Sequence, residues 1–183
     1  TADLCGSLDD LGFDSAVWTE GSVGDVTEKV GNFGKITYTF PSLNGVGSAF
    51  TLEANVYNFG TNGSDDWQIY TEISTADELI ALSKDSTKWS GNYVLTADIT
   101  LTAPENEGDS NWNAIGTEAA PFTGKFDGNG HTISGIVINK SGENDQGLFG
   151  YSTGLIMNVG VINSSISGGG FVGGSIPPYD EAW

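Results

Sequence analysis

One stretch of the chain, residues 121–150, recurs in shortened form between residues 155 and 174. The triplet Val-Ile-Asn stands at residues 137–139 and again 24 residues later, at 161–163. Gly-Leu-Phe-Gly at residues 147–150 is echoed 23 residues later by Gly-Phe-Val-Gly at 170–173. Short β-branched runs repeating in the low twenties are typical of a parallel β-helix, whose turns stack about 4.8 Å apart. The alternative is a coincidental repeat in a Gly-rich antiparallel protein.

Turn residues dominate the repeated stretch, which favours a role in stacking over a role in chemistry. A turn is predicted at Asp127, Gly128, Asn129 and Gly130, followed directly by His131, the one histidine of the chain. The 24-residue alignment places Asn139 over Asn163, so we expect these two side chains to form an Asn ladder.

The first third of the chain has a different pattern. Ile36, Tyr38 and Phe40 alternate with threonines, and the runs that begin at Phe50 and at Trp67 repeat this period of two. We take the third run to continue through Thr71. The alternation predicts a small antiparallel β unit over residues 1–70, either a sandwich-like module or a cap on the repeat region.

A single helix is expected, over residues 75–83. Thr75 and Glu78 have the spacing of a capping box, and Ala76, Leu79 and Ile80 give the inner stripe. The fold class is therefore all-β: a short right-handed parallel β-helix over residues 71–183 with one capping helix, preceded by the antiparallel unit.

Three motifs in order resemble the GLUG-motif repeat proteins. They are W-x-x-I-G-T at residues 112–117, F-x-G-x-F-D-G-N-G-H-x-I-S-G at 122–135, and Gly147, Leu148, Phe149 and Gly150. The resemblance covers about residues 73–174 and leaves residues 1–70 unassigned. It implies a β-helical repeat protein that is secreted or attached to the surface of a bacterium or archaeon. This chain departs from long members in carrying only about one and a half repeats, with the array broken off at residues 175–178.

Charge excludes several partners. The chain has 24 acidic residues, six lysines and no arginine, for a net charge of −18. Nucleic acid and anionic membrane surfaces both require clustered basic side chains. No apolar run is long enough to insert into a membrane. The sequence starts at Thr1 without an initiator Met, so either a signal peptide has been removed or the chain is a fragment.

Catalytic and metal-binding signals are weak. A Ser-His-Asp site or a His-based metal site would need His131, which the motif explains as a turn residue. Polysaccharide lyases bind acidic sugars through Arg or Lys, and hydrolases need paired carboxylates, of which none stands out. No organic cofactor is expected. A structural Ca²⁺ ion has four weak candidate ligands, for which a solvated acidic face is the simpler interpretation: Asp9, Asp10, Asp65 and Asp66.

We therefore expect a non-catalytic extracellular structural protein, either an adhesin module or a subunit of a surface filament or layer. The alternative is a carbohydrate-binding or polysaccharide-degrading module, with the five tryptophans as sugar platforms. Partners are other protein subunits, including further copies of the chain, or an extracellular glycan. Cys5 is either a small buried hydrophobe or an intermolecular tether. The candidate interface residues are Phe171, Ile176, Tyr179, Trp183 and Cys5.

Overall fold

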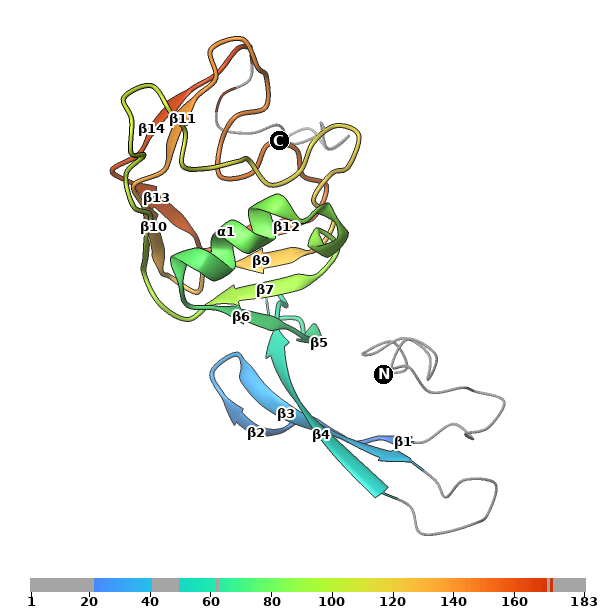
Figure 1. Cartoon of the computed structure of the whole chain (residues 1–183). Coiled ribbons are helices and arrows are strands. Elements are labelled where there is room, and N and C mark those ends of the chain that lie inside the picture. Colours follow the sequence, from blue (N-terminus) through green and yellow to red (C-terminus); the bar gives the residue numbers. More distant parts are fainter. Residues whose placement is uncertain (1–21, 41–49, 62, 171, 173–183) are drawn as a thin grey trace. The chain divides into compact units, whose positions relative to one another are not determined.

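The computed structural model describes residues 22–40, 50–61, 63–170 and 172. The chain divides into two compact units, Thr1–Tyr70 and Thr71–Trp183, and each is described by itself (Figure 1). The described residues are mostly β-structure with one short α-helix. A small antiparallel sheet comes first, and several short parallel sheets come after it.

The first unit contains a five-stranded antiparallel sheet, as its alternating sequence predicts. Ile36 and Tyr38 are buried on one face, where they pack with Val56. The strands are β1 (Ser22–Val23), β2 (Thr27–Val30), β3 (Phe33–Phe40), β4 (Phe50–Asn58) and β5 (Trp67–Ile69), with β1 and β2 both paired to β3, and β4 between β3 and β5.

The third alternating run is shorter than expected. β5 ends at Ile69, and Thr71 instead begins β6 (Thr71–Ile73), which pairs in parallel with β7 (Asn92–Leu95) of the second unit. The prediction that Thr71 continues the third antiparallel strand is therefore wrong. A period of two continues through residue 71, so alternation alone cannot show where the chain changes sheets.

The strand pairs in the described part of the second unit are all parallel. They form three short sheets, ordered β12-β9-β7-β6, β13-β10-β8 and β11-β14. The further strands are β8 (Ile99–Thr100), β9 (Lys125–Asp127), β10 (Thr132–Ser134), β11 (Val137–Asn139), β12 (Leu155–Met157), β13 (Gly160–Ile162) and β14 (Ser165–Ser167).

The register of these strands corrects the predicted 24-residue alignment. β13 pairs with β10 rather than with β11, so Val161 lies beside Ile133, 28 residues earlier. Ile133 in turn lies beside Ile99, at an offset of 34. The strands are only three residues long and similar in sequence, and the turns between them differ in length. The identical Val-Ile-Asn triplets therefore predicted β11, rather than β10, as the neighbour of β13.

The predicted Asn ladder is wrong for the same reason. Asn139 ends β11 beside Ser167, and its side-chain amide donates to the carbonyl oxygen of Gly108. Asn163 lies in the turn after β13 with φ 48°, in the left-handed region that Asn tolerates better than most residues. The corresponding turn after β10 contains Gly135, with φ 78°.

The predicted helix is confirmed. α1 (Ala76–Lys84) is capped by Thr75, whose side chain accepts from the Glu78 amide, while the Glu78 carboxylate accepts from the Thr75 amide. α1 lies over the β6-β7-β9 sheet (Figure 1), and its buried residues Leu79 and Leu82 belong to the apolar core of the second unit. A 3-10 turn, Ser86–Lys88, comes directly after the helix.

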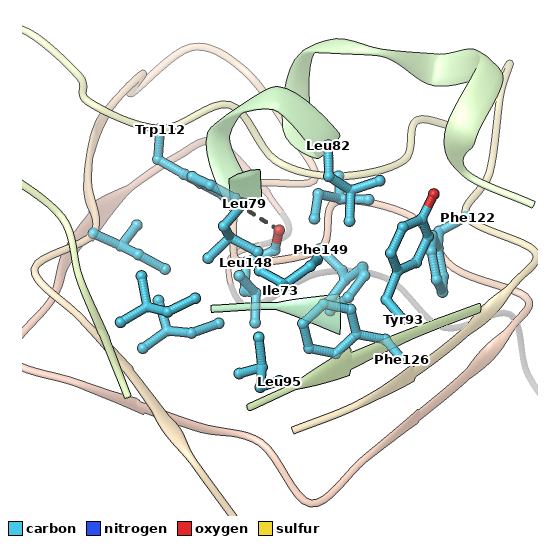
Figure 2. Packing of buried hydrophobic residues seen from close by; sticks show 14 of the residues in the cluster. Ile73, Leu79, Leu82, Tyr93, Leu95, Trp112, Phe122, Phe126, Leu148 and Phe149 are labelled. Atoms are coloured by element: carbon cyan, nitrogen blue, oxygen red, sulfur yellow. Dashed lines mark hydrogen bonds between the residues drawn. The ribbon is translucent and has the colours of Figure 1, made fainter. Parts of the chain in front are cut away.

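The described residues of the second unit share a continuous apolar core (Figure 2). Aromatic side chains fill its centre, with the Phe149 ring 5.0 Å from that of Phe122 and 5.2 Å from that of Phe126. Phe126 and Ile133 are 0% exposed, and Ile138 is 1% exposed. The middle residue of each of β9, β10 and β11 therefore lies entirely in the interior.

Glycines at one corner let successive turns of chain approach closely. Gly91, Gly124 and Gly154 each precede a strand of the β7-β9-β12 column. The amide of Lys125 donates to the carbonyl oxygen of Gly91, and that of Leu155 donates to the carbonyl oxygen of Gly124. A Cβ atom on Gly124 would overlap the Gly91 carbonyl, so a side chain there would force the turns apart.

A test of this corner compares two glycine-to-alanine substitutions. We expect G124A to lower the free energy of unfolding of the second unit by about 2 kcal/mol or more, because the new methyl meets backbone that cannot move alone. G142A is the matched control: Gly142 has open space around it, and the substitution should change stability by under about 1 kcal/mol. Urea unfolding followed by circular dichroism measures both. Equal effects of the two substitutions would contradict the packing argument.

Candidate functional site

The W-x-x-I-G-T and Gly-Leu-Phe-Gly motifs are two halves of one contact. The indole N–H of Trp112 donates to the carbonyl oxygens of Gly147 and Leu148, at 3.1 and 3.2 Å. The backbone of Ile115 accepts from Gly150 at 2.8 Å and donates to Leu148 at 3.1 Å. Figure 2 shows Trp112 beside Leu148, with Phe149 turned into the core. The first motif thus comes from one turn of chain and the second from the next.

Two glycines make this contact possible. Gly116 has φ +85°, and a Cβ atom there would overlap the carbonyl oxygen of Tyr151. Gly150 lies over the same corner, where a Cβ atom would come within 2.5 Å of the Gly116 carbonyl oxygen. The two motifs therefore carry glycine where backbone meets backbone.

The Asp127–Gly130 turn is held by a buried carboxylate. Asp127 is fully buried, and its Oδ1 accepts from the Asn129 amide at 2.7 Å and from the Asn158 side chain at 3.0 Å. Asn129 and Asn158 both have positive φ, 50° and 53°. Because Asn158 belongs to the next turn of chain, Asp127 links two successive turns at this corner.

His131 lies beside Asp98 at the same corner. Its Nδ1 is 3.4 Å from Asp98 Oδ1, which also accepts from the amide of Thr132 at 2.8 Å and from the Thr132 hydroxyl. These contacts, led by the Thr132 amide, hold the pKa of the Asp98 carboxyl below its ordinary value. The Thr132 hydroxyl is thus directed at the Asp98 carboxylate. The contacts of Asp98 with His131 and Thr132 hold β10 to the preceding turn.

Asp65 and Asp66 are engaged in a loop of the first unit. Asp65 accepts from the Asn58 side-chain amide at 3.1 Å, and Asp66 accepts from Gln68 at 2.8 Å. Asn58 Oδ1 in turn accepts from the amides of Gly60 and Asp66. Across residues 22–40, 50–61, 63–170 and 172, no three His, Cys, Asp or Glu side chains are grouped to hold a metal ion. The other two candidate ligands, Asp9 and Asp10, lie outside the described residues.

Two of the five tryptophans are unsuited to sugar binding. Trp112 and Trp89 are buried, and the Trp89 indole donates to the carbonyl oxygen of Leu82 at 2.9 Å. Trp67 is half-buried, with the Lys29 ammonium 5.1 Å from its ring centre. Trp18 and Trp183 lie outside the described residues.

The predicted interface residues also fall outside the described part of the chain: Phe171, Ile176, Tyr179, Trp183 and Cys5. The structure instead exposes apolar side chains ten and nine residues before Phe171, at Val161 and Ile162. Sequence reasoning missed them because it assigned residues 161–163 to the position of β11. The five-residue spacing of β12, β13 and β14, which begin at residues 155, 160 and 165, is the sequence pattern that could have indicated the correct position of residues 161–163.

Two known proteins are similar to part of this chain. A segment of 114 residues, 56% of the chain, is 40% identical to halomucin of Haloquadratum walsbyi, a large extracellular archaeal protein. A segment of 78 residues, 42% of the chain, is 37% identical to a protein of Evansella cellulosilytica described as a Gly-rich membrane protein. The matched segments span 1% and 9% of those proteins. No protein-family model and no solved structure matches the chain.

In its described part, no helix is long and apolar enough to cross a membrane.

A substitution of Trp112 tests the contact between the two motifs. We expect W112F to lower the free energy of unfolding by about 2–3 kcal/mol, because the carbonyl oxygens of Gly147 and Leu148 lose the indole donor, Leu148 keeping the Ile115 amide, and the smaller ring leaves a cavity. T153A, at an exposed side chain, should stay within about 0.5 kcal/mol of the wild type. Chemical unfolding measured by far-ultraviolet circular dichroism reports both. A W112F protein as stable as T153A would show that the indole does not hold the two turns together.

A pH titration tests the Asp98 brace. The pKa of this carboxyl is lowered in the folded state, so its stabilising effect is complete above the unfolded pKa of about 3.9 and is lost as the pH falls through the lower folded pKa. We expect D98N to be less stable than the wild type at pH 7, with the difference shrinking below about pH 4. Unfolding curves across this range measure it. E105Q is the control for the loss of a surface charge, because Glu105 lies in an exposed segment and should show no such convergence.

Proposed function

We propose that the second unit is a short right-handed parallel β-helix of GLUG-type repeats. Three columns of parallel strands support this assignment, since each column continues through successive turns of chain. The interior is filled by side chains, as expected for a solenoid whose turns contact only their neighbours.

We further propose that this unit serves as a non-catalytic structural module of an extracellular surface protein, either an adhesin module or a subunit of a surface filament or layer. One observation supports it best: the residues of the distinctive motifs are engaged in holding one turn of chain to the next. Trp112 and Asp127 both bond to residues of a later turn. The similarity to halomucin and to a membrane protein favours a cell-surface location.

A carbohydrate-binding or polysaccharide-degrading module is the alternative. It needs either an exposed row of aromatic rings or two carboxylates facing one another across a cleft. Burial removes Trp89 and Trp112 from that role, and Asp127 is enclosed in its turn. The partners we propose are protein subunits rather than nucleic acid or membrane, in keeping with the charge of −18.

Assays on polysaccharides test this function directly. The purified chain is incubated with neutral and acidic polysaccharides, and reducing ends and unsaturated uronates are measured; a glycan array measures binding. We expect no reducing ends, no unsaturated uronates and no glycan bound on the array. We also expect that protease added to intact source cells cleaves the second unit. Turnover that is lost in D98N or H131A, or saturable glycan binding lost in W67A, would establish the alternative instead.

Salt dependence tests the acidic surface. Raising NaCl from about 0.1 M to about 1 M shortens the Debye length from about 10 Å to about 3 Å and screens repulsion within a chain of net charge −18. We therefore expect the free energy of unfolding to rise with NaCl. The triple variant E105Q/E107Q/D109N removes three exposed charges and should give a shallower slope. Stability that falls with NaCl, or a slope unchanged in the variant, would contradict this account.

A further inference from the structure

The last described turn of chain, β12-β13-β14, presents three strand edges at the same end of the second unit. Each strand pairs on one side only, with β9, β10 and β11 respectively, and each is the final strand of its sheet among the described residues (Figure 1). The strands begin at residues 155, 160 and 165, so β12 and β14 flank β13 at equal spacing.

Among the described residues, the backbone groups of these three strands that have no partner belong to the three middle residues. In each strand the first residue donates its amide to a carbonyl oxygen of the preceding turn: Leu155 to Gly124, Gly160 to His131, and Ser165 to Ile136. The last residue of each strand accepts at its carbonyl oxygen from an amide of that turn: Met157 from Gly128, Ile162 from Gly135, and Ser167 from Lys140. Alternate residues of a parallel strand bond to the same neighbour. The N–H and C=O groups of Ile156, Val161 and Ile166 therefore point away from the preceding turn, to an edge that no other described strand covers.

The side chains at this edge are less covered than those one turn earlier. Val161 is 41% exposed, whereas Ile133 beside it is 0% exposed. Ile156 and Ile166 are half-buried, whereas Phe126 and Ile138 at the corresponding positions are fully buried. A further layer of strands on this edge would bury all three residues as their counterparts are buried.

The edge also lacks the features that keep strand edges apart. Edge strands of soluble proteins usually carry charges, prolines or bulges that block pairing. Residues 147–170 contain no charged residue and no proline, in a chain whose net charge is −18. A neutral edge offers nothing to a basic or an acidic ligand. A second acidic copy meets less repulsion at this uncharged edge than at the acidic parts of the surface.

We propose that the β12-β13-β14 edge is a homodimer interface formed with the same edge of a second copy. A two-fold axis through β13 reverses the direction in which the chain runs around the stack, so the two edges meet antiparallel. β13 then pairs with β13 of the other copy, and β12 pairs with β14. This is an isologous contact, self-complementary by symmetry.

The unused backbone groups fit this arrangement. Val161 pairs with Val161 of the second copy, and Ile156 pairs with its Ile166, each pair exchanging two N–H···O=C bonds as in an ordinary antiparallel ladder. The three side chains meet their counterparts across the axis and become interior. The interface rests on the proposed β-helix, because only stacked turns present all three edges together.

Sedimentation equilibrium and cross-linking test the dimer on the full chain. We expect the wild type to dimerise, more tightly at about 1 M NaCl than at about 0.1 M. V161K should raise the dimer dissociation constant at least about 100-fold, because two ammonium groups would face each other across the axis. V30K places the same charge on an exposed valine of the first unit and should leave dimerisation unchanged.

Cysteine placement tests the register. In a C5S background, V161C should form a disulfide-linked dimer on mild oxidation, because paired Cα atoms about 5.5 Å apart lie within disulfide range. V30C is the control and should stay uncrosslinked. A wild type that is monomeric at about 100 μM, dimers unaffected by V161K, or equal cross-linking of V30C would overturn the proposal. Unchanged unfolding curves for V161K separate such a failure from a failure of the β-helix itself.

Discussion

The second unit depends on backbone lying directly against backbone from one turn of chain to the next. Parallel strands bond at about 4.8 Å, a separation that leaves no room for a side chain pointing along the stack. Gly124 lies over the Gly91 carbonyl, and Gly150 lies over Gly116, so both corners meet this limit by omitting Cβ. The abundance of glycine in this chain is thus in part a consequence of stacking rather than of flexibility.

Close stacking also explains how strands of three residues form a stable unit. β9, β10 and β11 each contribute one central side chain to the interior, and a single strand of that length would bury too little to persist alone. Aromatic residues from separate turns, Phe122, Phe126 and Phe149, join these contributions into one core. Leu79 and Leu82 of α1 add to the same core. Asp127 and His131, whose side chains are chemically able to act as acids or bases, lie at corners where hydrogen bonds hold the turns in place.

Sequence reasoning succeeded where the cause of structure is local. The capping box at Thr75 and Glu78 involves atoms within four residues of one another, and the alternation of Ile36 and Tyr38 reports one sheet face directly. It failed at the register of β13. The turn between β9 and β10 holds four residues, 128–131, whereas that between β12 and β13 holds two, 158–159. No single offset relates such turns, so a 24-residue match of Val-Ile-Asn selected the wrong strand.

The sequence by itself determined the β-rich class, the single capped helix, the turn residues and the acidic, arginine-free surface, because each of these depends on composition or on neighbours along the chain. Only the tertiary structure decided which strands lie side by side, that Asp127 is enclosed, and that Val161 rather than Asn163 marks the exposed edge. Parallel pairing joins residues about 30 positions apart through backbone groups that every amino acid carries. Which strand pairs with which therefore depends on the lengths of the turns and on the packing of side chains in the interior. A short sequence pattern contains neither.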